Sequence, residues 1–89
     1  MRKSRKKIAE VAEAYVQQLK ERFPRAEAEI VYESIGGGDV WVNIELPPEM
    51  RDQRPKVVDA TIDLNFRYSD ETGVNVVATV QAREAVTHG

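Results

Sequence analysis

Hydrophobic and polar residues alternate one by one along two stretches in the second half of the chain. Apolar residues stand at every second position over 58–68 and again over 74–82, with the polar segment 69–73 between them. Successive side chains of a strand point to opposite faces of its sheet, so this period of two is typical of half-buried strands. Asp70 and Gly73 are residues that tight turns favour. The pattern therefore predicts a β-hairpin in which Tyr68 faces Val74.

A helix over 56–68 that ends at Gly73 is the alternative, and it gives the element order α-β-β-α-β. Its apolar side chains spread around most of a helical wheel, whereas Val57, Thr61 and Ile62 are of types enriched in strands. The strand is therefore the preferred interpretation.

An amphipathic helix is predicted over 4–23, because apolar residues recur there at spacings of three and four. Ser4 suits the N-cap, and Pro24 ends the helix by forcing the residue before it out of the helical region. The apolar positions are Ile8, Val11, Ala12, Tyr15, Val16, Leu19 and Phe23.

A second hairpin is predicted from strands 27–35 and 39–46, joined at the glycines 36–38. Glycine accepts the positive φ angles of a tight turn. Counting outward from this turn pairs Tyr32 with Val42, Ile30 with Ile44, and Ala28 with Leu46, each pair on one face. The prolines 47–48 end the second strand, and a loop with one helical turn follows over 47–55.

These elements predict one α+β domain over 1–89, in which the N-terminal helix packs on an antiparallel sheet of two hairpins (α-β-β-β-β), with a loose tail at 84–89. The inward set is Ala28, Ile30, Tyr32, Val40, Val42, Ile44, Val58, Ala60, Ile62, Leu64, Phe66, Val74, Val76, Ala78 and Val80.

Residues for catalysis and metal binding are scarce. The chain has no cysteine and one histidine, His88, close to its end. Serine and cysteine nucleophiles are activated by a neighbouring base, most often histidine, and zinc sites are built from cysteine and histidine. We therefore expect no catalytic residue, no metal and no cofactor. No apolar run reaches the roughly 18 residues of a membrane span, and no signal peptide is visible, which favours a cytoplasmic protein.

The charges are distributed unevenly. Five of the thirteen basic residues lie before Ile8, and eight basic residues face fifteen acidic ones in the rest of the chain. A basic arm on an acidic body is one signature of nucleic-acid binding, although no aromatic residue accompanies this arm for base stacking. The arm over 1–7 comprises Arg2, Lys3, Arg5, Lys6 and Lys7.

The outer face of the predicted sheet carries an unusual residue, a tryptophan among polar groups. Exposed aromatic side chains are enriched where partners dock. We therefore predict a non-catalytic module that binds a protein partner, or a second copy as a homodimer, through this face or through an edge strand. The face is also acidic, through Glu29, Glu33, Glu45, Asp59 and Asp63, which favours a basic partner. The candidate residues are Val31, Glu33, Trp41, Asn43 and Val77.

The glycines 36–38 followed by Asp39 on a strand resemble the minimal nucleotidyltransferases over 30–45. That family has a Gly-Ser pair and a second aspartate on the strand, and here the pair is missing and Trp41 stands in the second position. Two metal-binding carboxylates are needed for that chemistry. The resemblance therefore implies at most an inactive relative.

Overall fold

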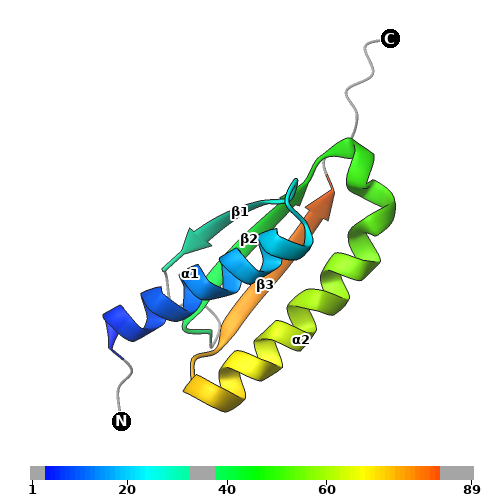
Figure 1. Cartoon of the computed structure of the whole chain (residues 1–89). Helices are drawn as coiled ribbons and strands as arrows, with labels where there is room; N and C mark the ends of the chain where they lie inside the picture. Colours follow the sequence, from blue (N-terminus) through cyan, green and yellow to red (C-terminus); the bar gives the residue numbers. More distant parts are fainter. Residues whose placement is uncertain (1–3, 33–37, 83–89) are drawn as a thin grey trace.

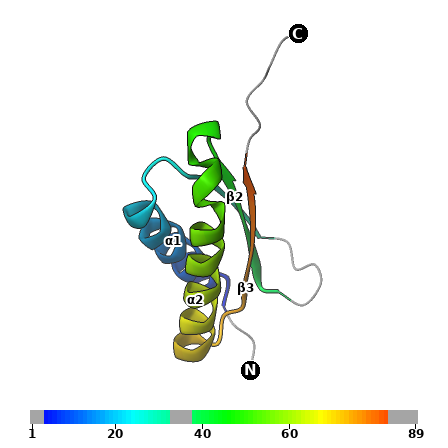
Figure 2. The ribbon, with the colours of Figure 1, turned by 90° about the vertical axis from the view of Figure 1, so that its right-hand side faces the viewer.

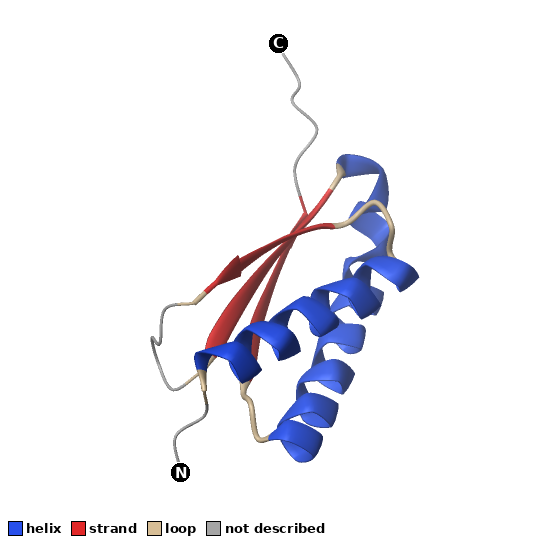
Figure 3. Cartoon of the chain, turned by 60° about the vertical axis from the view of Figure 1, so that its left-hand side comes forward, coloured by secondary structure: helices blue, strands red, loops and turns tan. Residues whose placement is uncertain are grey.

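The computed structural model describes residues 4–32 and 38–82. In chain order, the elements are α1 (Arg5–Arg22), β1 (Glu27–Val31), β2 (Val40–Leu46), the 3-10 helix η1 (Pro48–Gln53), α2 (Arg54–Thr72) and β3 (Val76–Ala82). The strands form one sheet in the order β1-β2-β3, where β1 and β2 are antiparallel and β2 and β3 are parallel (Figure 1). Both helices lie on one side of this sheet (Figures 2 and 3), so the fold is an α+β architecture of two layers.

The strand predicted over 58–68, as the first half of a hairpin with 74–82, is wrong, because this segment lies within α2. The sheet therefore has three described strands in place of two hairpins, and the alternative order α-β-β-α-β is the one observed. Two local signals favour the helix. A proline stands in its first turn, where its fixed φ angle is suitable, and Gly73 ends it at φ 75°.

The alternating pattern has a second meaning on a helix, because apolar residues at every second position also form two stripes with a spacing of four. The stripe of Ala60, Leu64 and Tyr68 is buried in the core. The other stripe runs from the half-buried Val58 to Ile62 and Phe66, which are 48% and 73% exposed. We call Ile62 and Phe66 the outer stripe of α2. Both were predicted to be core residues, and both lie at the surface.

The predicted first helix is confirmed by α1. The hydroxyl oxygen of Ser4 accepts a hydrogen bond from the backbone N–H of Lys7 at 3.1 Å, which is the N-cap arrangement. The helix ends before Pro24, where the N–H of Phe23 donates to the carbonyl of Leu19 at 2.8 Å. Its buried residues are Val11, Ala12, Tyr15 and Leu19.

The hairpin of β1 and β2 forms as predicted, but in a different register. Ala28 faces Ile44 and Ile30 faces Val42, so the pairing differs by two residues from the expected one. A shift of two keeps every side chain on its predicted face. The connection is longer than the glycines alone, because β1 ends at Val31 and β2 starts at Val40. Tyr32 lies beyond β1 and is 53% exposed, so its placement in the core was wrong.

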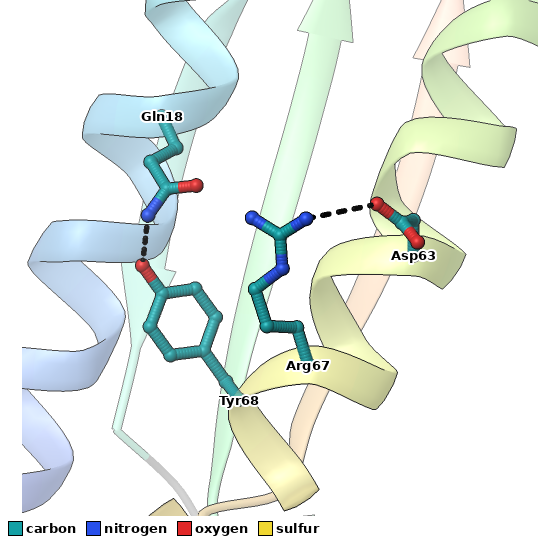
Figure 4. Close-up of polar contacts among 4 residues, drawn as sticks. All are labelled: Gln18, Asp63, Arg67 and Tyr68. Carbon is teal, nitrogen blue, oxygen red and sulfur yellow. Dashed lines mark hydrogen bonds and ion pairs between the residues drawn. The ribbon is translucent and has the colours of Figure 1, made fainter. Parts of the chain in front are cut away.

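The core lies between the helices and the inner face of the sheet. The central strand β2 buries alternate residues, and β3 adds Val76 and Val80. Figure 4 shows the contact between the two helices, where the Gln18 side chain donates to the Tyr68 hydroxyl. The Tyr15 ring lies 6.1 Å from the Tyr68 ring, centroid to centroid, and its hydroxyl donates to the carbonyl of Thr61. Burial raises the pKa of both tyrosines.

Candidate interaction surface on the outer face of the sheet

The face of the sheet opposite the helices carries no other described helix or strand (Figure 2). Strand pairing arranges its side chains in three rows that cross all three strands. The first is an apolar row of Val31, Trp41 and Val77, in which Trp41 is the direct neighbour of both valines. We call these residues the apolar row.

The other two rows are polar and become acidic toward the far end. Glu29, Asn43 and Thr79 form the middle row, where the Thr79 hydroxyl donates to the side-chain oxygen of Asn43 at 2.8 Å. The last row, which we call the acidic row, contains Glu27, Glu45 and Gln81.

The acidic row brings two like charges together, because Glu27 and Glu45 are direct cross-strand partners. Like charges in this position oppose strand pairing. The acidic row lies four residues along the strand from the apolar row, or about 13 Å at the usual rise of a strand. The face therefore offers a partner an apolar end and an anionic end at a fixed distance.

Gly38 partly covers the apolar row. A Cβ atom on this residue would lie 2.5 Å from Cγ2 of Val77 and 3.8 Å from Nε1 of Trp41. The backbone just before β2 therefore packs directly on the row, and Val31, Trp41 and Val77 are each half-buried. The segment predicted as a loop with one helical turn over 47–55 forms η1 and the start of α2.

The structure places the predicted surface residues as follows. Val31, Trp41 and Val77 are brought together in one row, and Asn43 is exposed in the next row. Glu33 lies outside the described residues. Thr79 and Gln81 share this face with Val77 by alternation but were not named as candidates, and their neighbours Asn43 and Glu45 follow from the parallel pairing of β3 with β2. No signal in the sequence indicated that pairing, or the packing of Gly38.

Two of the carboxylates predicted on this face lie elsewhere. Asp59 and Asp63 are on α2, one helical turn apart, because 58–68 is not a strand. They line a surface groove together with Arg22 and Lys56, next to α1. The Asp63 carboxylate also lies 3.7 Å from the guanidinium of Arg67 (Figure 4). The outer face of the sheet keeps Glu29 and Glu45.

Asp39, the aspartate of the nucleotidyltransferase resemblance, joins the starts of two strands. Its carboxylate accepts a hydrogen bond from the N–H of Asn75 at 2.8 Å, and its own N–H donates to the Asn75 carbonyl at 2.9 Å. Within residues 4–32 and 38–82, no three acidic or histidine side chains are grouped so that they could hold a metal ion.

Part of the predicted basic arm is described. Arg5, Lys6 and Lys7 are exposed in the first turn of α1, which contains no acidic residue. Cations at a helix N-terminus interact unfavourably with the helix dipole, so this charge does not stabilise α1. Arg2 and Lys3 lie outside the described residues, and nucleic-acid binding stays a prediction. None of the described helices is long and apolar enough to cross a membrane.

No protein-family model, curated protein or solved structure matches this chain.

Proposed function

We propose that this chain is a small non-catalytic interaction module that binds a protein partner on the outer face of its sheet. The observation that carries the proposal is the apolar row. Trp41 sits at its centre, between Val31 and Val77, on the face that the helices leave uncovered. Tryptophan is the residue type most enriched among side chains that dominate binding energies. A row of this kind supplies the apolar anchor of an interface.

The other two rows indicate the chemistry of the partner. The acidic row, with Glu29 of the middle row beside it, favours a cationic group on the partner, because opposite charges across an interface attract each other. The partner would then combine an apolar side chain over Trp41 with a basic side chain about 13 Å away. The middle row offers hydrogen-bonding groups between these two contacts.

A displayed library of random peptides tests this proposal with the whole chain as the target. We expect the selected peptides to combine a large apolar residue with lysine or arginine. Trp41→Ala is expected to weaken their binding by about 30-fold or more, which corresponds to a hot spot of 2 kcal/mol. Glu45→Gln is expected to weaken it less, and to make it less sensitive to salt.

Phe66→Glu is the matched control, because Phe66 is exposed on the helical side of the molecule. Circular dichroism shows whether each variant keeps the fold. Peptides whose affinity is unchanged in a folded Trp41→Ala variant would contradict the proposal.

A further inference from the structure

The strand β3, at one edge of the described sheet, lacks the side chains that usually guard a sheet edge. It is the last strand in the order β1-β2-β3, and its sequence VVATVQA contains no charge, proline or glycine. Natural edge strands are normally guarded by charged side chains, prolines or bulges, because their free backbone groups can pair with another chain. The opposite edge strand, β1, carries Glu27 and Glu29.

The direction of the free backbone groups follows from two hydrogen bonds. The carbonyl of Asn75 accepts from the N–H groups of Asp39 and Val40, so it points toward β2. Backbone groups of successive strand residues point to opposite sides. The even-numbered residues from Val76 to Ala82 therefore direct their N–H and C=O groups to the open edge. The Val80 carbonyl confirms this direction, since it accepts from Nε of Arg54 at 3.2 Å.

An apolar surface lies directly beside this edge. The outer stripe of α2 borders a surface groove that the start of β3 closes on the other side. Ile62 and Phe66 line it on the helix, and Val76 lines it on the strand. Asn65 also lines it, and its side-chain oxygen is buried without a hydrogen-bond partner among the described residues. The outer stripe of α2 thus lies beside the edge strand β3.

Shape decides what fits this edge. Paired strands lie about 4.8 Å apart, whereas packed helices need about 8–10 Å between their axes. A second copy that added its β3 here would bring its own α2 against the first, because α2 packs alongside β3 (Figures 1 and 2). In an antiparallel pairing, which keeps both helices on the same face of the sheet, the two helices would overlap. An extended segment without a covering helix meets no such obstacle.

We propose that the groove between β3 and α2 binds an extended segment of a partner protein, which adds to the sheet as a fourth strand. Every second side chain of the segment is apolar and packs on Ile62 and Phe66, while its backbone pairs with the even-numbered residues of β3. The segment carries a carboxylate where it meets the guanidinium of the exposed Arg54, which donates to the Val80 carbonyl near the opposite end of β3 from this groove. This is strand addition at a sheet edge. It uses a different surface from the proposed function and does not depend on it.

Amide hydrogen exchange measured by NMR tests the proposal. The probes are six-residue peptides of alternating valine and threonine, with glutamate at either the first or the last position, at millimolar concentration. We expect one of them to protect the amides of Val76, Ala78 and Val80. The amides of Val77 and Thr79 face β2, so we expect them to be protected already without peptide.

Four variants locate the contact. Phe66→Glu is expected to weaken binding at least tenfold, and Gln17→Glu, an equally charged change on the exposed side of α1, is expected to leave it unchanged. Arg54→Ala is expected to weaken binding of the glutamate peptide, but not of the same peptide with glutamine. Trp41→Ala is expected to have no effect, so failure of this proposal is distinguishable from failure of the proposed function.

The proposal is overturned if no probe protects the even-numbered amides. It is also overturned if Phe66→Glu binds as well as the unchanged chain. Protection of these amides without peptide would assign the edge to a second copy if it rises with protein concentration, or to the chain itself if it does not. Either result would overturn the proposal.

Discussion

At the scale of single residues, Gly38 allows the backbone to pack closely against Val77 of the apolar row. An added Cβ would lie 2.5 Å from Cγ2 of Val77, which is closer than real contacts allow. We expect Gly38→Ala to lower the free energy of unfolding by about 1–3 kcal/mol, the usual cost of overpacking. Trp41 is the only tryptophan of the chain, so its fluorescence reports the change directly.

Val77→Ala provides the control for this prediction, since it removes the methyl group in the way. The double variant is expected to recover part of the loss seen in Gly38→Ala alone. Additive effects of the two substitutions would show that the predicted clash is not the cause.

The buried Tyr15 predicts a loss of stability in alkali. Burial raises the pKa of its hydroxyl above the ordinary 10.0. The folded state therefore holds this proton more tightly than the unfolded state. Its contribution to stability is complete below pH 10 and is lost as the pH rises toward the pKa of the folded state. The loss is at most about 1.4 kcal/mol for each pH unit.

Denaturant unfolding at several values between pH 9 and pH 12 measures this loss. Tyr15→Phe is expected to give a shallower decline, while Tyr68, whose pKa burial also raises, keeps part of it. Tyr32→Phe is the matched control, because that ring is 53% exposed. An equally steep decline in Tyr15→Phe would count against the assignment.

The sequence predicted which residues lie on the outer face better than it predicted which residues they contact. Side-chain direction in a strand depends only on odd or even position, so Val31, Trp41 and Asn43 are on the predicted face although the register shifted by two residues. The close approach of Gly38 to Val77 depends on the path of the backbone, which no local pattern specifies.

At the scale of elements, α2 shows why an alternating pattern is ambiguous. Apolar residues at every second position satisfy a strand with one stripe and a helix with two. The choice between them depended on capping residues, and Gly73 with the proline of the first turn favours the helix. The preference of valine, threonine and isoleucine for strands was overridden by packing against α1 and β3.

Two substitutions on α2 distinguish the helix from the strand by how much each lowers the free energy of unfolding. Leu64 is 3% exposed, and Leu64→Ala is expected to destabilise the chain by about 2–5 kcal/mol. Phe66 is 73% exposed, and Phe66→Ala is expected to change stability by no more than about 0.5 kcal/mol. Denaturant midpoints measure both. A strand with both residues inside would make the two losses similar.

At the scale of the whole molecule, the α+β class and the helix on one face were predictable, but the strand order was not. The hairpin of β1 and β2 pairs segments that are close in the sequence, and the glycines 36–38 between them indicated it. The pairing of β2 with β3 joins residues such as Trp41 and Val77 that are far apart in the chain. It requires α2 to cross between parallel strands, so the wrong assignment of 58–68 removed the correct sheet as well.

The position of α2 beside β3 has a consequence for crowded solutions. Many proteins keep their sheet edges from pairing with one another by charged side chains on the edge strand, and the residues of β3 carry no charge. Steric exclusion takes the place of charge repulsion here, because α2 lies beside β3 and is too wide to fit next to the α2 of a second molecule. Antiparallel pairing of two copies along this edge is thereby hindered, whereas an extended segment without a helix meets no such obstacle.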